Sequence, residues 1–151
     1  MRFDDVEGLT AQISDQFGPW GPEVPITQDD INKFADLTGD HQWVHVDEDR
    51  AKASPLGTTI VHGFLLLAYL PKLKPGAGSE EITDYAAAFN AGGDKYRFVN
   101  MVPSGSTIHA RGRIAAIEKK PNGVRVTTAY EIAVVGSTSP AVVGTLIVMY
   151  Q

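Results

Sequence analysis

The sequence predicts an α+β fold in which a curved antiparallel sheet wraps around one central helix. The run Ile60 to Leu70 is apolar nearly all the way round, and a helix of this kind must be buried on every face. Much of the C-terminal half instead alternates apolar and polar residues with a period of two, as half-buried strands do. One buried helix followed by a meander of long strands favours a sheet curved around that helix.

Length and composition predict a single domain over residues 1–151, with residues 1–22 as an N-terminal arm or short helix laid over it. The absence of cysteine excludes disulfides and thiolate nucleophiles. A net charge of −5 argues against nucleic-acid binding. The start of the chain lacks a signal-peptide pattern, and the longest apolar run, Ala141 to Tyr150, is about half of what a membrane helix needs. We therefore expect a cytoplasmic protein that binds no membrane.

The first half of the chain predicts three short elements before the central helix: a strand at Val24–Thr27, a helix at Gln28–Thr38 and one or two helical turns at Glu48–Ala53. Thr27 and Asp30 have the spacing of a capping box, and Gly39 is a natural residue to follow a helix. We expect irregular backbone from Asp40 to Asp47.

The second half predicts strands joined by turns. Pro71 is expected to end the central helix, and Pro75 to Gly78 marks the change to extended structure. The turn signal Pro121-Asn122-Gly123 predicts a hairpin, and the last strand is continuously apolar, which favours a central place in the sheet. The predicted strands are Ile82–Asn90, Tyr96–Val99, Ser106–Lys119, Val124–Val135 and Ala141–Tyr150.

The segment Phe34 to Leu70 resembles the hydratase-2 motif of MaoC-like dehydratases, the (R)-specific enoyl-CoA hydratases of the hot-dog fold. The family pattern places an aromatic residue before a small-Gly-Asp step and a histidine five positions after the aspartate; here these are Phe34, Thr38-Gly39-Asp40 and His45. The block Gly57 to Gly63 resembles the family's approach to its central helix. The resemblance implies a single hot-dog domain whose overhanging segment carries the active-site loop.

The implied reaction is the reversible hydration of trans-2-enoyl-CoA to (R)-3-hydroxyacyl-CoA. It needs a base for the water, an acid for the α-carbon and a donor for the thioester oxygen. Asp40 and His45 supply the first two in kind. On a regular helix they would lie about 140° apart, but irregular backbone after Gly39 can turn both inward. Without the resemblance, the residues alone favour a simpler interpretation: Asp40 as a polar residue at a helix end and His45 as a surface imidazole.

In the family, the backbone N–H at the position of Gly63 binds the thioester oxygen; the alternative is that this glycine only permits close packing. We group His62, Gln42 and Trp43 with Gly63 as substrate-binding candidates. For His62 the simpler interpretation is structural, with the ring fixing the loop. Gln42 can hydrogen-bond the aspartate or the water, and Trp43 can line the acyl pocket or simply pack. Family members usually have Asn-Pro where this chain has Gln42-Trp43, which retunes the pocket. Some carry a serine where this chain has Tyr69, Leu70 and Pro71, so a serine-assisted role is in doubt.

Other polar residues have simpler interpretations. His41 is expected to face solvent or the pocket rim, and His109 lies on a surface face with Arg111 and Arg113. A metal site at the cluster Asp40, His41, His45 and Asp47 is disfavoured because the segment is not predicted to be helical and the family uses no metal.

Coenzyme A carries phosphates that need cations, and Lys95 and Arg97 are the candidates by position in the family, with Lys72 and Lys74 as alternatives. Coenzyme A is part of the substrate, so we expect no separate cofactor. The resemblance also implies a homodimer or a higher even oligomer. Two alternative functions stay open: a hot-dog acyl-CoA thioesterase, and a non-catalytic acyl-CoA-binding dimer. Thioesterases of this fold usually carry an acidic residue near the central helix in place of the Asp40–His45 pair.

Overall fold

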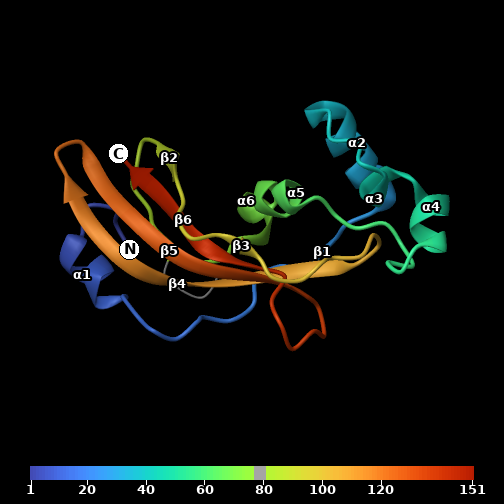
Figure 1. Ribbon diagram of the computed structural model, residues 1–151. Coiled ribbons are helices and arrows are strands. Elements are labelled where there is room, and N and C mark those ends of the chain that lie inside the picture. Colours follow the sequence, from blue (N-terminus) through green and yellow to red (C-terminus); the bar gives the residue numbers. More distant parts are fainter. Residues whose placement is uncertain (77–80) are drawn as a thin grey trace.

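A six-stranded antiparallel sheet curves around two short helices (Figure 1). The structure is a computed structural model and describes residues 1–76 and 81–151. Among these residues the strands run in the order β1-β4-β5-β6-β2, with β3 also paired to β6. The strands are β1 (Val24–Pro25), β2 (Ala88–Gly92), β3 (Arg97–Phe98), β4 (Thr107–Lys120), β5 (Gly123–Val134) and β6 (Val142–Tyr150). The predicted α+β fold class is confirmed.

The hairpin β4–β5 has the longest strand pairing in the sheet. Its strands pair from Ile108 opposite Val134 to Lys120 opposite Gly123, with one register shift between Ile114 and Ala116. The predicted turn at Pro121-Asn122-Gly123 joins them, and Gly123 has a φ of 148°, which only glycine adopts readily. The last strand, β6, is interior as predicted, because it lies between β5 and β2.

The central helix begins and ends later along the chain, and is less buried, than the sequence predicts. It consists of α5 (Gly63–Ala68) and α6 (Leu70–Leu73), and Pro71 does not end it but lies in the first turn of its second part. Proline is tolerated there because the first N–H groups of a helix have no intrahelical partner. Ile60 and Val61 are not helical: their N–H groups donate to the carbonyls of Val44 and Val102.

The helices bury one face against the sheet and leave another exposed. The ring of Phe64 is 63% exposed, although the sequence predicts burial on every face. The buried face packs against the concave side of the sheet, and each such side chain contributes about 1.5–3 kcal/mol. The core includes Leu65, Leu66, Leu70, Leu73, Ile108, Ala110, Ile132 and Val142.

An overhanging segment of three helices lies at one end of the sheet (Figure 1): α2 (Gln28–Thr38), α3 (Trp43–Val46) and α4 (Glu48–Ala53). The predicted capping box is present, since Thr27 and Asp30 exchange side-chain and backbone hydrogen bonds. Gly39 ends α2 in the left-handed conformation, with a φ of 81°. The irregular stretch expected from Asp40 to Asp47 contains a helical turn, α3.

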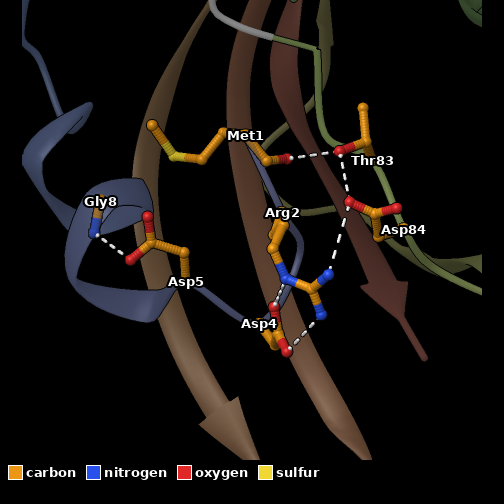
Figure 2. Close-up of polar contacts among 7 residues, drawn as sticks. All are labelled: Met1, Arg2, Asp4, Asp5, Gly8, Thr83 and Asp84. Atoms are coloured by element: carbon orange, nitrogen blue, oxygen red, sulfur yellow. Dashed lines mark hydrogen bonds and ion pairs between the residues drawn. The ribbon is translucent and has the colours of Figure 1, made fainter.

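The N-terminal segment covers the opposite end of the sheet and the free edge of β4. Helix α1 (Val6–Ala11) buries Leu9 against Ile114 and Val126. Figure 2 shows how the chain start is held: Arg2 pairs with Asp4 and Asp84, and the carbonyl of Met1 accepts from Thr83. Gly18 and Gly21 then donate to carbonyls of β4, so the segment runs along this strand as a partial edge.

Three strand predictions are too long. The predicted strand Val24–Thr27 is reduced to Val24–Pro25, and Tyr96–Val99 is reduced to the two residues of β3. The strand predicted from Ile82 begins only at Ala88, because residues 82–84 instead contact the chain start. The predicted turn Pro75–Gly78 falls partly on residues 77–80, which lie outside the described part. None of the helices in the described ranges is both long and apolar enough to span a membrane.

Candidate active site

The fold brings Asp40 and His45 together at the junction between α2 and α3. The Asp40 carboxylate lies 3.9 Å from Nε2 of His45, although no helical repeat would align them. The αL residue Gly39 ends α2 and turns the chain, so that both side chains reach the same space. The His45 side chain is 11% exposed and that of Asp40 is 42% exposed. The pair thus opens to solvent on the carboxylate side only.

The proton on the His45 ring is assigned by its partner. Nδ1 lies 2.7 Å from the carbonyl oxygen of Ile60, and because a carbonyl can only accept, Nδ1 donates. Nε2 of the neutral ring is then the atom with the free lone pair, and it faces Asp40. Two acceptors 3.9 Å apart suit a water molecule that lies about 2.8 Å from each and donates one hydrogen to each.

His62 lies directly behind this pair. Its ring is stacked on His45 with centroids 3.8 Å apart, and its Nε2 donates to the main-chain carbonyl of Asp40 over 2.9 Å. The aromatic residue of the motif, Phe34, packs edge-on against the same ring. Burial lowers the pKa of His62, and the neighbouring His45 acts in the same direction. His62 is only 2% exposed, so its side chain does not line a surface that substrate could reach directly.

A second buried contact holds His45 through its main chain. Nε2 of Gln28 donates to the carbonyl of His45 over 2.7 Å, and the hydroxyl of Thr59 donates to Oε1 of Gln28. Thr59 is 2% exposed. No sequence pattern indicated these two residues, because Gln28 reads as an ordinary first residue of a helix and the contact joins positions 31 apart.

Asp40, His45 and His62 each offer a possible metal-ligating atom, and these atoms lie within 4.8 Å of one another. A metal must lie near the plane of each imidazole that binds it. The rings of His45 and His62 are stacked at 22°, so their planes do not meet near the carboxylate. Nε2 of His62 also donates a hydrogen bond to the Asp40 carbonyl, so it offers no lone pair to a metal. The arrangement therefore suits a hydrogen-bonded pair better than a metal.

Gly63 is the first residue of α5, as the motif predicts, and its N–H has no partner within the helix. A side chain here would collide with the Phe98 ring, since a Cβ would lie 2.7 Å from its nearest carbons. Phe98 in turn contacts Phe64 and Tyr96 edge-on. The glycine thus serves close packing, and its N–H is also free to donate.

Within the described part of the chain, the side chains of the remaining substrate-binding candidates, Trp43 and Gln42, form no hydrogen bond or ion pair with Asp40 or His45. Trp43 is half-buried and packs under the guanidinium of Arg50. The Gln42 side chain is exposed, and only the backbone N–H of this residue approaches Asp40, at 3.5 Å. His41 pairs with Asp36 on the surface, and this hydrogen bond raises the pKa of His41.

The cationic candidates lie on the approach to β3. Lys95 and Arg97 are exposed, and within the described ranges neither forms an ion pair with a carboxylate. Arg97 is adjacent to Phe98, the residue that covers Gly63. His109 is not a free surface residue as predicted: Trp20 of the N-terminal segment stacks on it at 3.8 Å, and burial lowers its pKa.

A cavity of about 590 Å³ lies elsewhere, between the N-terminal segment and the end of α6. Lys74, Gly112, Ile114 and Tyr150 are among its lining residues, and neither Asp40 nor His45 borders it. The cavity is thus separate from the Asp40–His45 pair.

The MaoC like domain matches residues 18–135, which include Asp40, His45, Gly63 and most of the sheet. The chain belongs to the MaoC-like dehydratase family. This MaoC-like protein is 42% identical over 151 residues to 3-hydroxyacyl-thioester dehydratase Z of Mycobacterium tuberculosis, covering 98% of this chain and 97% of the relative. It is 38% identical over 112 residues to nodulation protein N of Rhizobium meliloti, covering 74% and 68% of the two chains.

Solved structures confirm the hot-dog fold of this MaoC-like chain. The (R)-hydratase of A. caviae involved in PHA biosynthesis superposes with a TM-score of 0.70 at 21% identity, covering 91% of this chain and 98% of the other. A MaoC-like dehydratase from Rhodospirillum rubrum gives the same TM-score at 20% identity, with 92% of each chain covered. At these identities the likeness shows the fold, and the family match shows a dehydratase or hydratase domain.

Proposed function

We propose that this MaoC-like dehydratase adds water reversibly to a trans-2-enoyl thioester of coenzyme A and forms the (R)-3-hydroxyacyl thioester. The observation that carries the proposal is the facing of the Asp40 carboxylate and the lone pair on Nε2 of His45 across 3.9 Å. The similarity to a 3-hydroxyacyl-thioester dehydratase supports the same class of substrate.

In this mechanism a water molecule donates one hydrogen bond to Asp40 and one to His45. Its oxygen attacks the β-carbon and forms the new C–O bond, while one proton leaves the water for the pair. The electrons of the double bond then take a proton at the α-carbon from the pair, so that one water is added in total and the pair is unchanged. Nε2 of His45 is suited to carry the proton, because Nδ1 already holds one in its bond to Ile60.

The negative charge that develops on the thioester oxygen needs a donor. The free N–H of Gly63 is our candidate, because it lies one residue from His62, whose ring is stacked on His45. We propose that Lys95 and Arg97 bind the phosphates of coenzyme A, because both lie close in the chain to Phe98, which contacts Gly63. The chemistry so described requires no separate cofactor or metal.

We further propose a homodimer. Every residue of β2 and β3 is exposed, and Phe64, Tyr96 and Phe98 on this face are 63%, 42% and 47% exposed. An apolar face of this kind beside an edge strand marks an interaction surface. Two structures of the same fold are complexes of two chains, ChsH1-ChsH2 and HadBC of Mycobacterium tuberculosis. A strictly monomeric mass by sedimentation at micromolar concentration, with full activity, would exclude the dimer.

The decisive experiment follows the absorbance of the conjugated double bond of crotonyl-CoA and longer enoyl-CoAs, together with a thiol reagent. Loss of absorbance without free thiol supports the hydratase. Release of free thiol identifies a thioesterase instead, and tight binding with neither change identifies a binding protein. The chirality of the product is then read with an (R)-specific 3-hydroxyacyl-CoA dehydrogenase.

A further inference from the structure

His45 and His62 each hold the segment that carries the other. The His45 ring, on the overhanging segment, donates to Ile60 in the approach to α5 over 2.7 Å. The His62 ring, at the start of α5, donates to Asp40 in the overhanging segment over 2.9 Å. The two rings are stacked between these bonds at 3.8 Å. The overhang is thereby joined to the central helix at the position of the reacting pair.

The two rings must carry their protons on different nitrogens. Each bond ends on a carbonyl oxygen, which can only accept, so the proton is on Nδ1 of His45 and on Nε2 of His62. Nδ1 of His62 is buried and has no partner among the described residues. A proton there would leave a buried donor unpaired, so the ring is held neutral with its one N–H directed at Asp40.

We propose that His62 is a positioning residue for the hydration reaction. Its neutral ring donates to the main-chain carbonyl of Asp40 and stacks against the His45 ring. The two contacts hold the Asp40 carboxylate and the His45 ring so that both face the same water. This inference rests on the proposed function. His62 itself is buried behind the pair and touches no substrate. Losing its N–H should therefore impair the chemical step more than substrate binding, because a displacement of about 1 Å can cost about 10²-fold in rate.

The test compares two substitutions. His62→Phe keeps a flat ring against His45 and Phe34 but removes the donor, whereas His62→Gln can place an amide N–H near the former Nε2. We expect His62→Phe to lower kcat by about 10- to 100-fold, the range that misplacement of reacting groups produces. KM should change by less than about twofold. His62→Gln should recover kcat to within about threefold of the wild type. His41→Phe, on the exposed neighbouring histidine, serves as the control and should leave kcat unchanged.

Equal kcat for the wild type and His62→Phe would overturn the proposal, and so would equal impairment of both variants with KM raised in parallel. Should His62→Phe fail to fold, the ring nitrogens of the wild-type protein are read by ¹H–¹⁵N correlation spectra at neutral pH. The expected result is a neutral His62 protonated at Nε2, and a proton on Nδ1 of His45. A charged His62, or a proton on its Nδ1, would contradict the assignment. An inactive wild type with these tautomers would instead reject the proposed function alone.

Discussion

The stacked rings of His45 and His62 donate to main-chain carbonyls in each other's segments, at Ile60 and Asp40. Two bonds that cross in this way restrain both the distance and the twist between the overhang and α5. The hydroxyl of Thr59, which precedes Ile60, donates to Gln28 of α2 and adds a third bond between the two segments. Asp40 and His45 are thus held by groups other than the two that we propose to react, so substitutions can test the proposed chemistry separately from this placement.

Substitution of the reacting pair should remove catalysis without removing binding. Asp40→Asn is nearly isosteric but eliminates the charge, and His45→Ala removes the group that carries the proton. Each should lower kcat by at least about 10²-fold, the usual scale for positioned acid–base groups. The double variant should be little worse than either single one, because residues that act as a unit are not additive. Steady-state hydration rates and acyl-CoA titration provide the two measurements.

The exposed His41 is the matched control for this experiment, because it is adjacent to Asp40 and pairs only with surface Asp36. His41→Ala should leave kcat unchanged. Retention of more than about a tenth of the wild-type rate in Asp40→Asn, which is above what loss of a positioned acid–base group permits, would show that the assignment of the pair is wrong.

The hydroxyl of Thr59 should contribute to stability through Gln28. Thr59→Val removes a buried donor and leaves Oε1 of Gln28 unpaired. We expect the free energy of unfolding to fall by about 1–3 kcal/mol, the cost of an unsatisfied buried group. Urea denaturation measures this loss. Thr10→Val is the control, since that hydroxyl bonds Val6 on an exposed helix and its loss should cost no more than about 0.5 kcal/mol. Equal losses in the two variants would show that the Gln28 contact contributes nothing.

Much of this site could be predicted from sequence because the motif is local. Asp40, His45 and Gly63 are separated by short, patterned segments, and the capping box and glycine that shape α2 are visible as residue types. The partners of His62 and Gln28 could not be predicted in this way. Each contact joins segments 17 to 31 residues apart, and a buried polar side chain has no periodicity that distinguishes it from a surface one.

The central helix shows a different limit. Apolar residues all around a helix predict burial, yet Phe64 is exposed and lies beside the exposed ring of Phe98 in β3. The sequence cannot distinguish a residue buried within the chain from one that is left for a partner surface. The prediction that Pro71 ends the helix is wrong, because a second helix begins at Leu70 and continues through Pro71.

Acid should destabilise the protein partly through His62. Burial lowers the pKa of His62 in the folded state. The hydrogen bond to Asp40 raises this pKa in part, and the neighbouring His45 lowers it further. Between its folded pKa and about 6.5, the unfolded chain binds a proton that the folded chain does not. Stability is therefore fully present above about pH 6.5 and falls as the pH decreases through this window. Tm measured from pH 7.5 to 5 should decline less in His62→Gln, which lacks this titration. Parallel declines would contradict a lowered pKa for His62.

The N–H of Gly63 can be tested apart from its packing. In the wild type any side chain at 63 meets Phe98, so the comparison is made in a Phe98→Ala background, where that ring is absent. Gly63→Ala keeps the N–H, whereas Gly63→Pro removes it. Proline suits this place, because residue 63 is the first of α5 and His62 before it has extended dihedrals of φ −58° and ψ 135°.

In that background Gly63→Ala should retain kcat to within about threefold, and Gly63→Pro should lose about 10²- to 10³-fold, the cost of one oxyanion donor. Circular dichroism and Tm show whether both variants keep the fold, since only a folded proline variant tests the donor. The two variants share the loss of glycine and the space left by Phe98, and therefore differ chiefly in the N–H. If a folded Gly63→Pro protein had the same kcat as Gly63→Ala, the thioester oxygen would have to bind a donor other than the N–H of residue 63.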